Sequence, residues 1–354
     1  WRASTASAEK AHYVGVCGSG MSALAQHRAM GGAAVTGSDR LLDRGETADV
    51  KKALEALGVA VFPQDGSGLS AGTSECVVST AIEADNPDLL KAGSLGVPVV
   101  HRADALAREV AAADCVAVAG TSGKSTVTAM VFEILRAAGR DPSVITGAGV
   151  SSLTRQGFLG NAWRGKGPLA IEADESDGTL PKYAPRWGLL LNVGKDHKEV
   201  PELMALFSAF RSRSATAVVN ADVPLFKDLL SGAATFGFES GALRGSDLAF
   251  DGRGCSFTAD GVRFELTHPG RHNAENALAA AAACREAGVA LQVAAEALRS
   301  FAGVSRRFEP LGTAAGVEVV DDYAHNPDKV RAVLAAAKAR AGRVLAVFQP
   351  HGFA

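Results

Sequence analysis

Short apolar runs alternate with amphipathic segments along the N-terminal part of the chain, and each run ends in a glycine-rich or polar turn. Runs this short suit buried strands, while the spacing of apolar residues in the segments between them suits helices. The alternation predicts an α/β fold with a parallel, doubly wound sheet up to about residue 106. The predicted strands span residues 12–16, 33–36, 60–62, 76–79 and 97–100, and the predicted helices include residues 23–30 and 51–57.

The same alternation resumes at residue 115. We expect strands at 115–119, 169–171, 189–192 and 217–220, an antiparallel hairpin-like stretch at 248–266, and alanine-rich helices at 271–287 and 293–301. A third α/β segment comprises a strand at 316–322, a helix at 327–341 and a strand at 344–348. Because one βαβ unit cannot cover both faces of a sheet, we expect this third domain to be truncated. The predicted domains are residues 1–107, 108–309 and 310–354.

The composition is that of a globular protein, with 47% hydrophobic and 21% charged residues in a chain of 354. This length allows two or three domains with separate cores. A formal net charge of −2 provides no basic field for nucleic acid or an anionic membrane, and the apolar stretches are shorter than a membrane span. The five cysteines form no CxxC pair, which suits buried thiols in a reducing compartment. We therefore expect a cytoplasmic enzyme without a signal peptide and without nucleic-acid or membrane partners.

The most informative motif follows the apolar run at residues 115–119. A glycine-rich turn leads there into a helical segment, so backbone N–H groups and a helix N-terminus face the same point. Lys124 adds a mobile positive charge, and the hydroxyl of Ser125 can ligate Mg²⁺ beside a nucleotide phosphate. The motif predicts ATP binding, against the alternative of a plain strand–helix connection. Its residues are Gly120, Thr121, Ser122, Gly123, Lys124, Ser125 and Thr126.

An acidic run and a histidine follow two further predicted strands. The run at residues 172–177 places carboxylates at the C-terminal end of a strand, where parallel sheets bind ligands, and carboxylate oxygens suit Mg²⁺. A solvated acidic turn is the alternative. His197, after the strand at 189–192, can ligate a second metal ion or hold a phosphate, although spacing alone favours a structural or exposed histidine.

Polar side chains also gather at later boundaries. Asn273 and Asn276 lie one helical step apart at the start of a predicted helix, where their amides can hydrogen-bond an adenine edge or simply cap the helix. Arg307 lies at the second domain boundary, where its charge can reach nucleotide phosphates. Asp322 and His325, between a strand and a helix, can bind ribose or an incoming substrate, although Asp also simply starts helices.

The first predicted strand enters a turn that contains Gly15, Gly18 and Gly20, with Asp39 further along the chain. This pattern invites an NAD-binding interpretation, but the spacing is not GxGxxG, and a glycine-lined turn also serves the diphosphate of UDP. An NAD(P)-binding oxidoreductase remains an alternative of another class, although it leaves the loop at residues 120–126 unexplained.

Taken in order, these segments resemble the Mur ligase family. Val118 stands where the common P-loop has glycine, and the resulting shorter loop is similar to that of this family. The resemblance implies three domains: an N-terminal Rossmann-like domain that binds a UDP sugar, a central P-loop ATPase domain, and a C-terminal Rossmann-like domain. The matching segments are residues 12–22, 36–40, 77–82, 120–126, 172–177, 192–197, 269–279, 301–309, 321–327 and 347–351.

The resemblance also implies an activity and a set of partners. The expected reaction is the ATP-dependent joining of L-alanine, or a similar amino acid, to the lactyl carboxylate of UDP-N-acetylmuramate. It passes through an acyl phosphate and serves peptidoglycan precursor biosynthesis, and thereby cell-wall biogenesis, cell shape and cell division. The family implies ATP and Mg²⁺ as cofactors, an amino acid or short peptide as the second substrate, and a monomer or homodimer.

Residue roles follow from the resemblance by position. Lys124, Glu175 and His197 would be catalytic, with Ser125, Glu175 and His197 as metal ligands. The loop would bind ATP together with Asn273, Asn276, Arg307 and Asp322, and His325 would lie on the amino-acid side. Gly18, Ser19, Gly20, Met21 and Ser22 would cradle the UDP diphosphate, with Ser38, Asp39 and Arg40 near the uridine.

Some positions depart from the pattern of the L-alanine-adding branch. Ser122 and Ser125 replace the His or Asn and the Thr that are usual in the loop, and Asn326 stands where that branch usually has His. Because Ser125 keeps a metal-binding hydroxyl, these departures affect the choice of substrate more than the ATP chemistry. A murein peptide ligase, which attaches a recycled peptide to the same sugar, is therefore the alternative within the family. Cys17 favours this alternative, whereas the segment Ser19–Ser22 favours the L-alanine-adding branch. A nucleotide-binding regulator without ligase activity is a further alternative.

Overall fold

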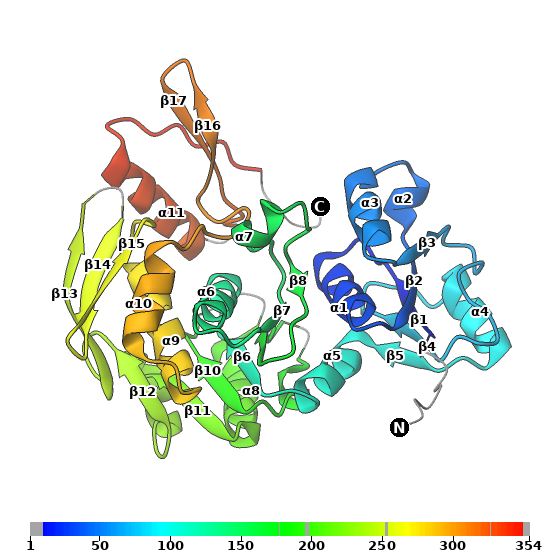
Figure 1. Ribbon diagram of the computed structural model, residues 1–354, viewed down its shortest axis with the longest axis horizontal. Helices are drawn as coiled ribbons and strands as arrows, with labels where there is room; N and C mark the ends of the chain where they lie inside the picture. The colour runs from blue at the N-terminus through cyan, green and yellow to red at the C-terminus, as the bar shows by residue number, and fades with distance from the viewer. Residues whose placement is uncertain (1–9, 177, 195–197, 252–253, 326, 350–354) are drawn as a thin grey trace. The chain divides into compact units, whose positions relative to one another are not determined.

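The computed structural model describes residues 10–176, 178–194, 198–251, 254–325 and 327–349 (Figure 1). The chain divides into two compact units, of which the first comprises Trp1–Asp114 and Pro142–Leu169. The second comprises Cys115–Asp141 and Ala170–Ala354. The segment Pro142–Leu169 therefore packs with the N-terminal residues although it follows the glycine-rich loop in the sequence.

The N-terminal part of the first unit is a sheet of five parallel strands in the order β3-β2-β1-β4-β5. The central strand β1 is buried over most of its length, and its His12 lies opposite Thr36 and Cys76 on the neighbouring strands. This arrangement confirms the predicted parallel sheet. The strands are β1 (Lys10–Val14), β2 (Ala34–Ser38), β3 (Ala60–Phe62), β4 (Glu75–Val78) and β5 (Val99–His101).

Helices connect these strands, and α4 illustrates why they begin and end where they do. Asn86 accepts a hydrogen bond from the amide of Asp88, Pro87 occupies the first turn, and Gly96 ends the helix with a φ of +66°. The helix packs Ala92 into a core with Val14. The helices are α1 (Ser19–Met30), α2 (Arg40–Asp43), α3 (Ala48–Ala56), α4 (Pro87–Leu95) and α5 (Arg102–Ala111).

The later segment of the first unit adds a short antiparallel pair and one helical turn. Strand β7 (Ser143–Ile145) pairs with β8 (Ala162–Trp163), and α7 (Ser151–Thr154) lies between them in the sequence. Both strands contact α1.

The second unit is built on a sheet in which parallel and antiparallel strands follow one another, in the order β15-β14-β13-β12-β11-β10-β6-β9. Strand β6, which leads into the glycine-rich loop, and strands β10, β11, β12 and β13 pair in parallel, and β13, β14 and β15 form the predicted antiparallel stretch. The strands are β6 (Cys115–Ala119), β9 (Leu169–Glu172), β10 (Trp187–Leu190), β11 (Thr216–Asn220), β12 (Ala234–Gly237), β13 (Leu243–Phe250), β14 (Cys255–Ala259) and β15 (Val262–Leu266).

The helix that follows the loop is buried against two alanine-rich helices, α9 and α10 (Figure 1). Its Met130, Val131 and Phe132 are fully buried, as are most alanines of α9, because small side chains let helices approach closely. The helices are α6 (Lys124–Ala137), α8 (Val200–Arg213), α9 (Arg271–Glu286) and α10 (Leu291–Arg299), with 3₁₀ turns η1 (Leu180–Lys182) and η2 (Pro224–Leu229).

The C-terminal segment differs from the predicted βαβ unit. Strand β17 (Val317–Asp321) forms an antiparallel hairpin with β16 (Glu309–Ala314), and α11 (Pro327–Arg340) follows. The hairpin loop is Ala315-Gly316, and both residues have positive φ, as a tight two-residue turn requires. The predicted parallel arrangement is therefore wrong for this strand.

The strand predicted at residues 344–348 is also wrong, because these residues form no strand in the structure. Val347 and Leu345 are 102% and 72% exposed. An apolar run becomes a strand only when a neighbour supplies backbone hydrogen-bond partners, and no described strand pairs with this one. Within the described parts of the chain, no helix has both the length and the apolar character needed to cross a membrane.

Candidate active site

The glycine-rich loop between β6 and α6 depends on two glycines. Gly120 and Gly123 have φ values of +143° and +85°. A Cβ atom at Gly123 would lie 2.5 Å from Oδ1 of Asn276, and one at Gly120 would lie 3.0 Å from Cβ of Leu191. Because α6 begins at Lys124, directly after this turn, its first-turn N–H groups face outward from the end of the sheet. The loop is thus shaped for an anionic ligand.

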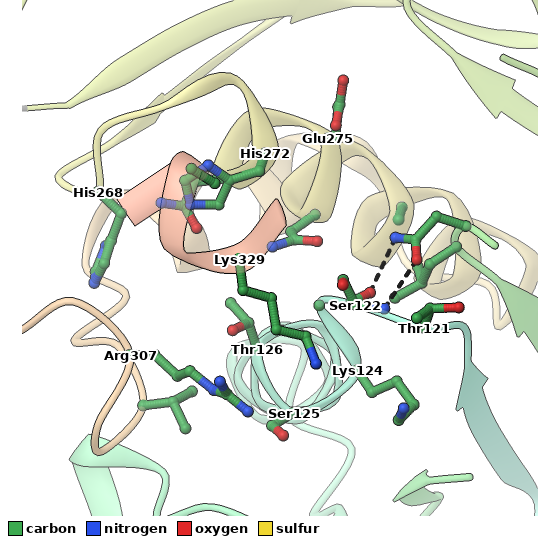
Figure 2. Close-up of a pocket in the computed structure, with 18 of the residues that line it drawn as sticks. Thr121, Ser122, Lys124, Ser125, Thr126, His268, His272, Glu275, Arg307 and Lys329 are labelled. Carbon is green, nitrogen blue, oxygen red and sulfur yellow. Dashed lines mark hydrogen bonds between the residues drawn. The ribbon is translucent and has the colours of Figure 1, made fainter. Parts of the chain in front are cut away.

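Asn192, two residues after the buried strand β10, holds the loop in shape. Its Oδ1 accepts a hydrogen bond from the amide of Ser122 at 2.9 Å, and its Nδ2 donates to the carbonyl of Ser122 at 3.0 Å (dashed lines in Figure 2). The amide of Gly194 donates to the Thr121 hydroxyl at 3.0 Å. Sequence reasoning missed this role of Asn192, although Asn192 ends the strand predicted at residues 189–192 and begins the family-like segment at residues 192–197.

Lys124 turns back toward the acidic run. Its Nζ donates to the carbonyl of Gly120 at 2.9 Å and to Oε2 of Glu175 at 2.7 Å, and it lies 3.8 Å from Asp174. Burial acts to lower the pKa of Lys124, but the neighbouring carboxylates of Glu175, Asp174 and Glu172 outweigh it and raise this pKa. Burial raises the pKa of Glu175. The structure therefore brings together two of the three predicted catalytic residues.

Ser125 meets a different carboxylate. Its hydroxyl lies 3.0 and 2.9 Å from the two oxygens of Glu172, the last residue of β9. Of the predicted metal ligands, Ser125 thus pairs with Glu172, whereas Glu175 pairs with Lys124. His197, the third predicted ligand, lies outside the described residues. Glu172 belongs to the acidic run that the sequence singled out, but its partnership with Ser125 needed the structure.

A cavity of about 450 Å³ opens over the loop. The first turn of α9 and the C-terminal segment complete its wall, and Figure 2 shows Arg307 and Lys329 pointing toward the N-terminal end of α6. Gly120, Glu175 and His325 are not among the lining residues. Those that sequence reasoning predicted are Thr121, Ser122, Gly123, Lys124, Ser125, Thr126, Asn273, Asn276, Arg307 and Asp322, together with Glu172 of the acidic run, and those that it missed include Asn192, His268, His272 and Lys329.

The start of α9 supplies amides and uncharged imidazoles to this cavity. Nδ2 of Asn273 donates to the carbonyl of Pro269 at 2.7 Å, so this side chain supports the helix start. Burial, helped by Arg340 and His272, lowers the pKa of His268 to about 4, and burial also lowers the pKa of His272. Both rings are therefore neutral near pH 7, which suits contact with an uncharged heterocycle.

The C-terminal residues have mixed roles. The carboxylate of Asp322 accepts hydrogen bonds from the amides of Phe308 at 2.7 Å and Ala324 at 2.8 Å. The guanidinium of Arg307 lies 5.7 Å from the ring of Tyr323. Nδ1 of His325 lies 3.0 Å from the carbonyl of Tyr323, and the structure does not bring His325 to the cavity.

The residues predicted to bind a UDP sugar lie in the first unit, where the loops after β1 and β2 meet. Asp39 joins these loops, because its Oδ2 accepts from the amide of Cys17 and its Oδ1 from the amide of Leu41, both at 2.9 Å. Ser38 donates to Asp88, which also lies 3.3 Å from His12. These buried contacts fix the shape of the loops after β1 and β2.

The remaining predicted residues of that site form the first turn of a helix and an exposed ion pair. Gly18 precedes α1 without a side-chain cap, and α1 contains Ser19, Gly20, Met21 and Ser22. Arg40 pairs with Glu83 at the surface.

Three family models match successive parts of the chain. They are described as the Mur ligase family catalytic domain, matching residues 10–113, the Mur ligase middle domain, matching residues 118–284, and the Mur ligase glutamate ligase domain, matching residues 306–352.

Relatives with curated names agree with these models. A UDP-N-acetylmuramate–L-alanine ligase of Streptomyces avermitilis is 39% identical over 98% of this chain and 77% of its own length. One from an Arthrobacter species is 40% identical over 97% of this chain and 76% of its own length.

Solved structures show the same similarity. The UDP-N-acetylmuramate–alanine ligase of Thermotoga maritima matches with a TM-score of 0.82 and 30% identity, covering 94% of this chain and 78% of that one. A murein peptide ligase of Psychrobacter arcticus matches with a TM-score of 0.78 and 26% identity, covering 93% of this chain and 76% of that one. The loop, the acidic strand end and these similarities together show that the chain belongs to the Mur ligase family.

Proposed function

We propose that this chain is an ATP-dependent ligase that joins L-alanine to the lactyl carboxylate of UDP-N-acetylmuramate, in the synthesis of peptidoglycan precursors. The observation that carries the proposal is the pairing of Lys124 with Glu175 and of Ser125 with Glu172 beneath the loop cavity. The names of the relatives support this choice of substrates.

The proposed reaction has two steps. The lactyl carboxylate attacks the γ-phosphorus of ATP, which forms an acyl phosphate and releases ADP. The amine of the amino acid then attacks the acyl carbon, loses a proton and displaces inorganic phosphate, which leaves the amide. Neither step needs a protein nucleophile, so the protein acts by holding the reacting groups together and offsetting phosphate charge.

The cavity residues fit these tasks. The loop amides and the first turn of α6 would bind phosphate oxygens, with Lys124 moving from Glu175 to the nucleotide. Arg307 and Lys329 would add positive charge from the C-terminal segment. Asn276, with the neutral rings of His268 and His272, would face the adenine base. Asn273 would orient this helix start, and Asp322 would hold the loop that carries Arg307.

Ser125 and Glu172 fit a Mg²⁺ ion, because a hydroxyl and a carboxylate are already held together beside the phosphate loop. The described residues contain no group of three or more His, Cys, Asp or Glu side chains that could hold a metal ion by themselves. This donor set suits Mg²⁺, which keeps several waters and takes further ligands from phosphates. When bound, the ion would neutralise the charge that develops on the phosphates. We retain Glu175 and His197 as further candidate ligands.

The sugar nucleotide would bind in the first unit, with its diphosphate at Gly18–Ser22 and its uridine near Ser38, Asp39 and Arg40. We keep residues 1–107, 108–309 and 310–354 as the proposed domain limits, and His325 as a candidate on the amino-acid side. The protein would work in the cytoplasm as a monomer or homodimer. Four cysteines are buried and all five are free, which fits a reducing compartment.

A murein peptide ligase is the second candidate, because the structure of one matches with a TM-score of 0.78. ADP release would be measured with UDP-N-acetylmuramate and Mg-ATP, adding either L-alanine or the L-alanyl-γ-D-glutamyl-meso-diaminopimelate tripeptide. We expect turnover with L-alanine. Turnover with the tripeptide alone would replace the proposal by the second candidate, and thermal stabilisation by Mg-ATP without any by UDP-N-acetylmuramate would contradict both.

A further inference from the structure

Helix α1 opens with the turn that is proposed to bind the sugar-nucleotide diphosphate, yet it has no side-chain cap, because Gly18 precedes it. Its first-turn amides are thereby left to a ligand, and something else must keep this turn in place. Two side chains of the segment Pro142–Leu169 bond to α1, one near each end. We propose that Asn161 and Arg164 clamp α1 and position its first turn for the sugar nucleotide, an inference that rests on the proposed function.

Asn161 binds the N-terminal end of α1. Its Nδ2 donates to the carbonyl of Ser19 at 2.8 Å and to the hydroxyl of Ser22 at 2.9 Å. Its Oδ1 accepts from Nε2 of Gln26 at 2.8 Å, and Gln26 also donates to the carbonyl of Ser22 at 3.0 Å. Asn161 is 6% exposed and Gln26 is fully buried, so water cannot replace these bonds without opening the structure.

This arrangement acts on the orientation of the first turn. The Ser22 hydroxyl also donates to the carbonyl of Ser19 at 3.1 Å, so Asn161 completes a small ring of bonds around these two residues. With the Ser19 carbonyl and the Ser22 side chain both drawn toward Asn161, the first-turn amides keep one direction. A turn that is already oriented binds an anion without a further ordering cost.

Arg164 binds the other end of the same helix. Its Nη1 donates to the carbonyl of His27 at 3.3 Å and lies 3.6 Å from Oε2 of Glu109. Glu109 in turn lies 3.3 Å from Nδ1 of His27. A Cβ atom at Gly31 would lie 2.7 Å from Cζ of Arg164, so the glycine after the helix leaves room for the guanidinium.

A short strand lies between Asn161 and Arg164 in the sequence. Residues Ala162–Trp163 form β8, which pairs with β7 and contacts α1, and Ala162 is fully buried. The clamp therefore rests on paired backbone rather than on a free loop. The same stretch of chain continues into β9, whose last residue is Glu172, but the clamp itself lies within the first unit.

The test compares three variants by titration with UDP-N-acetylmuramate and, separately, with Mg-ATP. Asn161→Leu removes every bond of the amide at similar volume, and Asn161→Asp keeps the acceptor for Gln26 but loses both donors. Ser143→Ala is the control, because Ser143 is buried in the same segment and its hydroxyl bonds to the backbone of Gly165 rather than to α1. We expect Asn161→Leu and Asn161→Asp to bind the sugar nucleotide about tenfold more weakly, with KM raised more than kcat changes.

Mg-ATP binding should stay within about twofold in all three variants, and Ser143→Ala should keep its affinity for the sugar nucleotide. Folded Asn161→Leu protein with wild-type affinity and KM for the sugar nucleotide would overturn the proposal. If Asn161→Leu does not fold, Asn161→Asp and Arg164→Met decide the question in the same assay: weaker binding of the sugar nucleotide supports the clamp, and wild-type affinity in both variants overturns it.

Amide hydrogen exchange separates this inference from the proposed function. Without any ligand, the amides of residues 19–22 should exchange faster in Asn161→Leu than in the wild type, while Ser143→Ala leaves them unchanged. Unchanged exchange in Asn161→Leu contradicts the clamp. Wild-type protein that binds no UDP-N-acetylmuramate contradicts the proposed function instead, and the exchange result still decides whether the clamp exists.

Discussion

The hydroxyl of Ser125 lies 3.0 and 2.9 Å from the two carboxylate oxygens of Glu172. The next residue back along the chain, Lys124, pairs with Glu175 at 2.7 Å instead. Two neighbouring loop residues thus engage two carboxylates of the same acidic run. The Ser125 hydroxyl and the Lys124 ammonium therefore have separate acidic partners.

Replacing Lys124 should abolish catalysis without changing the affinity of the protein for the sugar nucleotide. In Lys124→Ala, we expect ADP formation to fall by about a hundredfold or more, because a cation that offsets phosphate charge is lost. Affinity for UDP-N-acetylmuramate, measured by titration, should stay near that of the wild type. Arg136→Ala is the control, since Arg136 lies on the same helix and pairs with Glu133 at the surface. Normal turnover in Lys124→Ala would contradict the nucleotide assignment.

The two carboxylates should differ in their effect on the Mg²⁺ requirement. We expect Glu172→Gln to raise the Mg²⁺ concentration for half-maximal turnover by about tenfold or more, because an amide is a weaker ligand than a carboxylate. Glu175→Gln should also lower turnover, since it removes the buried partner of Lys124. A Mg²⁺ titration of both variants checks this. An unchanged curve for Glu172→Gln would move the metal role to Glu175, Asp174 or another residue.

Asn192 should determine how well the loop binds ATP. In Asn192→Leu, the amide and carbonyl of Ser122 lose their partners, and we expect KM for ATP to rise about tenfold. The control is Ser212→Ala on α8, which removes one exposed hydrogen bond to the carbonyl of Ala209. Steady-state kinetics with ATP varied would show the difference, and equal KM values for both variants would show that the loop holds its shape unaided.

Lys329 should contribute to ATP binding from the C-terminal segment. It lines the cavity, so Lys329→Met should raise KM for ATP several-fold, and the difference from the wild type should shrink at high salt. Lys338→Met is the matched control, because Lys338 lies on the same helix and is exposed. The same KM in both variants would exclude a phosphate contact for Lys329.

Glu109 should make stability depend on pH in the acid range. Burial acts to raise its pKa, but His27, Arg28 and Arg164 outweigh burial, and the pKa of Glu109 is lowered. A carboxylate with a lowered pKa stabilises the fold fully above its ordinary pKa, and this contribution is lost as pH falls through the lowered value. We therefore expect the wild type to lose more stability than Glu109→Gln between about pH 5 and about pH 3.

Urea midpoints measured across this range check the pH prediction. Glu265→Gln is the control, since Glu265 is 58% exposed and lies 4.0 Å from Arg299. Parallel acid curves for the wild type and Glu109→Gln would show that protonation of Glu109 does not contribute to acid unfolding.

Several expectations came from local sequence alone and were confirmed. The alternation of apolar runs predicted the parallel sheet of the first unit, and the strand–glycine–helix order predicted the loop before α6. The antiparallel stretch near residues 248–266 was confirmed as β13, β14 and β15. The C-terminal strands were predicted less well, because the Ala315-Gly316 turn folds β17 back on β16 and residues 344–348 have no pairing partner among the described strands.

By itself, the sequence determined the fold class, the family and the phosphate loop. The signals for these features are glycine positions, apolar runs and a lysine after a turn, and each signal is contained within a few consecutive residues. Only the tertiary structure decided that Asn192 holds the loop from 70 residues away, that Glu172 rather than Glu175 meets Ser125, and that Lys329 lines the cavity. Each of these is a contact between strand ends or helix starts far apart in the chain. Such contacts depend on which strands become neighbours in the sheet, and the spacing of side chains along the sequence does not determine the order of the strands.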